Sequence, residues 1–128
     1  MTMALPIGTV TFLFSDIEGS TRLARGLSAD AWAGILERHD QLVDAAVAGH
    51  AGVVVKHEGD GTFAAFASAA DAAAGAIEIA RSMANEAWPT GEPVRVRIGI
   101  HTGEGRLTRD GNDYVGVDVH YAARLSAA

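Results

Sequence analysis

The chain has 128 residues, of which 48% are hydrophobic and 20% charged. This size and composition predict one globular domain spanning 1–128 and argue against disorder. The net charge of −6 disfavours non-specific binding to nucleic acid or to anionic membranes. The absence of cysteine excludes disulfides and zinc–cysteine sites.

The N-terminal segment lacks the basic-then-apolar order of a signal peptide. No apolar run reaches the ~18 residues that a transmembrane helix needs. We therefore predict a cytoplasmic protein with no membrane and no nucleic-acid partner.

The first half of the chain predicts a strand, a helix and a hairpin. Residues 9–15 are apolar and β-branched, which is typical of a strand covered on both faces. Apolar residues recur every three or four positions over 29–48, which predicts an amphipathic helix with Ser28 as its N-cap. The apolar runs 52–57 and 62–67 flank a Gly/Asp turn, which predicts a β-hairpin.

The second half predicts a helix, a strand, a polar arm and a last helix. Ser68 opens an Ala-rich helix that runs to about Ala87. Strict alternation over 94–100 predicts a half-buried strand, the arm follows at 104–112, and the last helix begins near Val117. The order β-α-β-β-α-β predicts an α+β fold. Its core is a ferredoxin-like split βαββαβ unit with an antiparallel sheet and helices on one face, plus the C-terminal helix.

Two aspartates point to a metal site. Asp16 follows the first strand, and Asp60 lies in the turn between the second and third strands. The first strand of this fold lies beside the third, so the two carboxylates are expected to share one edge of the sheet. Such a pair can hold Mg²⁺ and leave positions for phosphates. The alternative is that both residues serve only the local turns.

Other polar residues have a functional and a structural interpretation. The backbone N–H groups of 19–21 would start a short helix and suit a phosphate. Lys56 lies in an otherwise apolar strand, where it either reaches past the sheet edge into solvent or is placed for a ligand. His120 and Arg124 share one face of the last predicted helix, and Asp113 precedes it. The alternative here is a solvated helix face.

Three segments together resemble the class III nucleotide cyclase catalytic domain. They read VTFLFSDIEGSTRL at 10–23, VKHEGDG at 55–61 and DYVGVDVHYAARL at 113–125. The RVRIGIHTGE strand fits the same family, and the closest likeness is to stand-alone actinobacterial adenylyl cyclases. The resemblance spans nearly the whole chain and implies a head-to-tail homodimer whose active sites draw on both subunits.

The resemblance also implies roles for the acidic edge. Asp16 and Asp60 would hold two Mg²⁺ or Mn²⁺ ions, helped by the backbone carbonyl of Ile17. The phosphate-binding turn would consist of Glu18, Gly19, Ser20 and Thr21.

Base recognition and catalysis would come from the other motifs. Lys56 would donate to ring N1 of adenine, and Asp113 would accept from its N6 amine, whereas guanine would leave both groups mispaired. Arg124 would stabilise charge on the α-phosphate. The implied reaction converts ATP to cyclic AMP and pyrophosphate by attack of the ribose 3′-oxygen on the α-phosphorus. The two metal ions would assist this attack.

Two departures from the family pattern predict a slow enzyme. His120 stands where the family usually has an asparagine that bonds the ribose. Because histidine changes charge near neutrality, we expect a rate that depends on pH at about 6–7. The sequence ends at Ala128, four residues past Arg124. Family domains usually continue with further strands, which include a basic residue for the terminal phosphates and are absent from this sequence. Either the sequence is a fragment of a longer chain, or the protein is a minimal version with weak activity.

Three other interpretations remain. A catalytically silent module of the same fold would bind nucleotide or regulate a partner, but it has no chemical need for the whole set of site residues. A diguanylate cyclase would need a GG-[DE]-E-F-like turn, and the sequence there reads HEGDGTF. The third is an interaction domain with no ligand.

Overall fold

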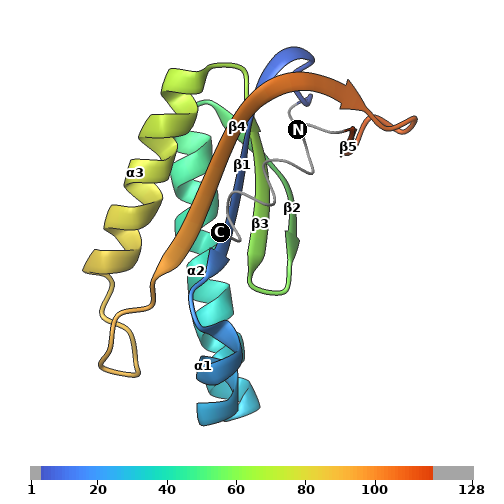
Figure 1. The fold of residues 1–128 in the computed structure, drawn as a ribbon. Helices are drawn as coiled ribbons and strands as arrows, with labels where there is room; N and C mark the ends of the chain where they lie inside the picture. Colours follow the sequence, from blue (N-terminus) through green and yellow to red (C-terminus); the bar gives the residue numbers. More distant parts are fainter. Residues whose placement is uncertain (1–3, 117–128) are drawn as a thin grey trace.

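The computed structural model describes residues 4–116 (Figure 1). The elements in chain order are β1 (Gly8–Ile17), α1 (Ser20–Gly26), α2 (Ala29–Gly49), β2 (Gly52–Glu58), β3 (Gly61–Phe66), α3 (Ala69–Asn85), β4 (Val96–Leu107) and β5 (Tyr114–Val115). The last predicted helix, from near Val117, lies outside the described residues. No helix within 4–116 has both the length and the apolar character needed to cross a bilayer.

The strands form one antiparallel sheet in the order β2-β3-β1-β4-β5. Helices α2 and α3 pack side by side against one face of it (Figure 1). The prediction of a split βαββαβ core with helices on one face is therefore confirmed. β1 lies between β3 and β4, which places its C-terminal end beside the β2–β3 turn.

Alternation along β1 determines what each sheet face carries. Leu13 and Ile17 belong to the core under the helices, whereas Phe12 and Phe14 belong to a second cluster on the opposite face. We call this opposite side the open face. Asp16 lies two residues beyond Phe14, so the period of two places it on the open face as well.

The core under the helices leaves no space for a side chain at Gly52. Phe66 of β3 is fully buried there, together with Val43 of α2 and Ile79 of α3. Burying each such side chain stabilises the fold by about 1.5–3 kcal/mol. A Cβ atom at Gly52 would lie 2.4 Å from the Phe66 ring, so only glycine fits at the start of β2.

The predicted caps are present, and the strand bounds differ. Ser28 accepts a hydrogen bond from the Ala31 N–H at 3.1 Å, and Ser68 caps α3 in the same way. β4 continues through Leu107 into the segment predicted as a polar arm. It does so because its backbone pairs with β1 as far as Gly8, and this ladder does not depend on side-chain polarity.

Candidate functional site

The two predicted metal carboxylates lie at one edge of the sheet. Asp60 Oδ2 accepts a hydrogen bond of 2.9 Å from the backbone N–H of Ile17, the residue that follows Asp16. The β1–β3 register, in which Ser15 pairs with Thr62, brings the turn to the end of β1. The geometry therefore brings Asp16 and Asp60 to the same place, as the topology predicts.

Asp16 has a partner to which none of the sequence motifs pointed. Arg97 of β4 stands directly opposite Asp16 in the strand register. Its Nε–H donates to Oδ1 at 2.7 Å and its Nη2–H to Oδ2 at 2.8 Å. The hydrogen bond to Asp16 is the largest of the causes that raise the pKa of Arg97, and the charges of Glu18 and Asp60 add to it. Alternation alone would have placed Arg97 on the open face, but its partner depends on the register.

The predicted phosphate-binding turn leads into a short helix, as expected. Gly19 has φ 67°, a left-handed conformation that favours glycine. The Glu18 N–H donates to the Arg95 carbonyl at 2.7 Å, so this amide is already engaged. The N–H groups of Ser20 and Thr21 belong to the first turn of α1, which has no intrahelical acceptors for them.

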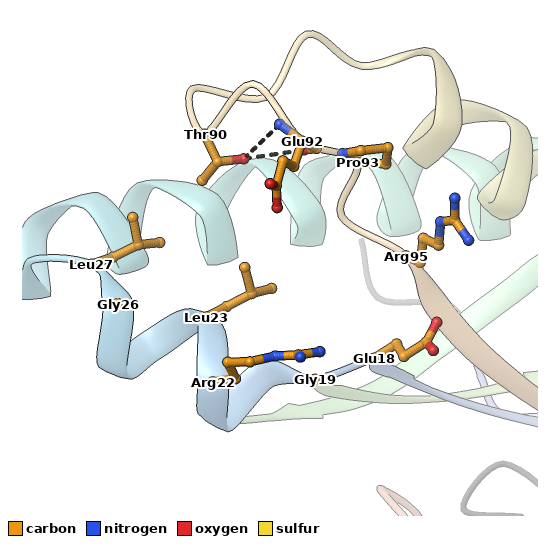
Figure 2. A pocket seen from close by; sticks show the side chains of 10 residues that line it. All are labelled: Glu18, Gly19, Arg22, Leu23, Gly26, Leu27, Thr90, Glu92, Pro93 and Arg95. Carbon is orange, nitrogen blue, oxygen red and sulfur yellow. Dashed lines mark hydrogen bonds between the residues drawn. The ribbon is translucent and has the colours of Figure 1, made fainter.

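A pocket of about 610 Å³ adjoins this turn. Figure 2 shows it between α1 and the loop that leads into β4. Two acidic and two basic side chains line it, namely Glu18, Glu92, Arg22 and Arg95. The aspartates Asp16 and Asp60 are not in its lining. The pocket therefore reaches only the phosphate-turn end of the predicted site, and its balanced charge favours no particular ligand.

Lys56 and Asp113 meet directly. Lys56 Nζ donates to Asp113 Oδ2 at 2.7 Å, and Glu58 Oε1 lies 3.5 Å from the same ammonium. The hydrogen bond to Asp113 is the main cause that raises the pKa of Lys56. The structure thus brings together the two residues expected to read the purine edge.

A β-bulge aims Lys56 at the open face. Val54 pairs with Ala64, but the next paired residue is Lys56, opposite Phe63. The extra residue, Val55, packs in the open-face cluster with Phe63. Strict alternation would have turned Lys56 toward the helices, because a one-residue shift reverses every side chain.

His57 has no role expected from the sequence. It anchors β2 on the face of the sheet that the helices cover. Its Nε2 lies 2.8 Å from Asp44 Oδ1 of α2, and its Nδ1 lies 2.9 Å from Thr62 Oγ1 of β3. The contact with Asp44 joins β2 to α2, and the contact with Thr62 joins β2 to β3. They therefore fix the backbone from which Lys56 projects.

Two stacked phenylalanine rings line a pocket together with Lys56. The rings of Phe14 and Phe63 are stacked, with centroids 4.3 Å apart and planes inclined by 10°. A pocket of about 110 Å³ is lined by both rings, Lys56 and Glu58. Apolar ring surface next to an ammonium group suits a flat heteroaromatic ligand with a polar edge.

The acidic edge offers the oxygen donors that Mg²⁺ prefers. The donors are the carboxylates of Asp16 and Asp60 and the carbonyl of Ile17, an oxygen-only set that leaves room for water and phosphate. Within 4–116 no three acidic or histidine side chains converge on one point. The residues fit Mg²⁺ or Mn²⁺ provided that Arg97 releases Asp16. The two predicted catalytic residues, His120 and Arg124, lie outside the described residues.

Comparisons with known proteins all point to nucleotide cyclase catalytic domains. The model of the family described as "Adenylate and Guanylate cyclase catalytic domain" matches residues 3–128. An uncharacterised protein of Mycobacterium tuberculosis is 42% identical over 122 residues, which cover 94% of this chain and 39% of that protein. A putative adenylate cyclase of Rhizobium meliloti is 29% identical over 117 residues, 90% of this chain and 20% of that protein. The chain thus spans well under half the length of these curated relatives.

Solved structures share the fold. The guanylyl cyclase domain of a rhodopsin fusion protein from Blastocladiella emersonii matches 99% of this chain and 79% of its own, with a TM-score of 0.88 and 23% identity. The adenylate/guanylate cyclase/hydrolase from Silicibacter pomeroyi matches 93% of this chain and 69% of its own, with a TM-score of 0.77 and 36% identity.

Proposed function

The chain belongs to the adenylate and guanylate cyclase catalytic domain family, and from this premise we propose that residues 1–128 form one catalytic domain of a slow, cytoplasmic adenylate cyclase. It would convert ATP to 3′,5′-cyclic AMP and pyrophosphate. The observation that carries the choice of ATP is the 2.7 Å hydrogen bond between Lys56 and Asp113 beside the stacked pair Phe14–Phe63.

Adenine matches this pair in hydrogen-bond polarity. Its edge offers an acceptor at N1 next to a donor at N6, so Lys56 and Asp113 can exchange their mutual bond for one bond each to the base. Guanine offers a donor at N1 and an acceptor at O6. The donor Lys56 would then face a donor, and the acceptor Asp113 would face an acceptor. Where the bound base shields this pair from solvent, each mispaired polar group costs about 1–3 kcal/mol, so ATP should be preferred over GTP.

The acidic edge would hold the metal ions. Asp16, Asp60 and the Ile17 carbonyl would bind two Mg²⁺ or Mn²⁺ ions. When bound, these ions would lower the pKa of the ribose 3′-hydroxyl and offset the negative charge of the phosphates. The turn of Glu18, Gly19, Ser20 and Thr21 would orient the phosphates through the N–H groups of its last three residues, because the Glu18 N–H is already bonded to the Arg95 carbonyl. Most of the rate enhancement would then come from positioning and electrostatics.

The remaining catalytic groups come from the C-terminal motif. Arg124 would stabilise charge on the α-phosphate, and His120 would bond the ribose. Replacing His120→Asn should raise the rate and flatten its dependence on pH between about 6 and 7, because an amide does not titrate. An unchanged rate and pH profile would remove His120 from the site.

The two halves of each site would come from different subunits of a head-to-tail homodimer. The deciding experiment measures cyclic nucleotide formed from ATP, and separately from GTP, with Mn²⁺ at several protein concentrations. Cyclic AMP that rises faster than linearly with protein supports an ATP-specific enzyme that must dimerise. Nucleotide binding without product at any concentration contradicts it.

A silent cyclase-fold module that binds nucleotide or regulates a partner is the second candidate. It is favoured by one observation, namely that Arg97 engages both carboxylate oxygens of Asp16. The same turnover assay separates the two functions.

A further inference from the structure

The guanidinium of Arg97 occupies the place where a cation would meet Asp16. The two residues are direct cross-strand partners on the open face. Both oxygens of Asp16 accept hydrogen bonds from the guanidinium, at 2.7 and 2.8 Å. This two-point pairing is the strongest form of a carboxylate–arginine contact. A metal ion that binds either oxygen must therefore break one of these bonds or take a remaining lone pair against the adjacent positive charge of the guanidinium.

Arg97 is surrounded by negative charge. Glu18 and Asp60 also favour its charged form, in addition to Asp16. Arginine stays protonated at every physiological pH, so pH cannot remove the competing charge. The Arg97 side chain is 45% exposed and the Asp16 side chain 25%, so the guanidinium has solvent into which it can swing.

We propose that Arg97 is the built-in counter-cation of the Asp16–Asp60 pair, and that a divalent cation binds there only by displacing the Arg97 guanidinium. This inference rests on the proposed function, because it takes the two aspartates as the metal ligands. In the metal-free protein Arg97 neutralises carboxylates that would otherwise repel each other. The same contact lowers the affinity of the site for Mg²⁺ or Mn²⁺ as long as the guanidinium stays in place.

The test measures Mn²⁺ binding to the nucleotide-free protein, with electron paramagnetic resonance used to quantify free Mn²⁺. Arg97→Gln removes the competing charge and the two-point contact, so it should bind Mn²⁺ about tenfold more tightly or better than the wild type. Arg95→Gln is the matched control. It makes the same charge change two residues away on an exposed side chain, and it should stay within about twofold of the wild type.

A further variant separates this inference from the proposed metal site. If Asp60→Asn loses Mn²⁺ binding while Arg97→Gln equals the wild type, the metal site stands and the role of Arg97 is wrong. Weaker binding by Arg97→Gln also overturns the inference, because it would mean that Arg97 positions Asp16 for the metal. If no variant binds Mn²⁺, the carboxylate pair is not a metal site and both proposals fail.

Folding is checked by thermal melts in the presence of a chelator. Should Arg97→Gln not fold, Arg97→Lys replaces it. Lysine keeps the charge but gives up the two-point geometry, so it should bind Mn²⁺ more tightly than the wild type by a smaller factor. Affinity equal to that of the wild type in a folded Arg97→Lys protein would count against displacement.

Discussion

The carboxylate of Asp60 accepts a hydrogen bond of 2.9 Å from the backbone N–H of Ile17, so one side chain joins the β2–β3 turn to the end of β1. Asp60 is therefore structural as well as a candidate metal ligand. From the sequence alone, Asp16→Ala and Asp60→Ala are both expected to leave the fold intact, because both residues would lie at a solvent-facing edge. For Asp60 this hydrogen bond adds an expected loss of stability to the loss of activity.

Asp60→Ala should abolish turnover and also lower the free energy of unfolding by about 1 kcal/mol, because the Ile17 N–H loses its partner. Asp60→Asn is the matched control, since its amide oxygen still accepts that bond while the charge is gone. It should be inactive but as stable as the wild type in urea denaturation. Full activity in either folded variant would remove Asp60 from the metal site.

Lys56→Glu should abolish the preference for ATP over GTP, because an acceptor replaces the donor that faces ring N1. The readout is the ratio of kcat/KM for the two nucleotides. Arg81→Glu makes the same charge change on the exposed surface of α3 and should leave the ratio unchanged. Unaltered discrimination in folded Lys56→Glu would refute base reading by Lys56.

Mixing Asp16→Ala with Arg124→Ala, each inactive alone, should restore activity to about a quarter of the wild-type value. Half of the dimers are then mixed, and each mixed dimer has one intact site out of two. Turnover of the mixture is compared with that of each variant alone. No recovery, with mixed dimers demonstrated by mass spectrometry, would contradict a site shared between subunits.

Tyr114 holds the hairpin that carries Asp113. Its hydroxyl donates to the Pro6 carbonyl at 2.6 Å, and burial raises its pKa from 10.0 to about 12. The folded protein binds this proton more tightly than the unfolded chain. The resulting stabilisation is complete below about pH 10 and is lost as the pH rises through about 12.

An ultraviolet titration of tyrosinate should therefore show one late-titrating tyrosine that Tyr114→Phe removes. The same substitution should lower the free energy of unfolding by about 1 kcal/mol. It should also raise KM for ATP more than it lowers kcat, since Asp113 would be held less firmly. A late tyrosine that persists in Tyr114→Phe would assign the shift to Tyr121.

Local patterns were sufficient for the elements of this fold. Helix periodicity over 29–48 and the caps Ser28 and Ser68 are read from neighbouring residues, and the structure has them as predicted. Strand alternation also placed Val94, Val96, Ile98 and Ile100 on one face, where they contact the helical core. The roles of His120 and Arg124 stay predictions.

The contacts of the site were decided by tertiary structure. The sequence alone determined the order of elements, the family resemblance and the candidates Asp16, Asp60, Lys56 and Asp113, because turn chemistry and motifs are local. It could not show that Arg97 faces Asp16, or that a bulge turns Lys56 to the open face. Both depend on the register between strands that are far apart in the chain, and register is set only when the whole sheet packs against its helices.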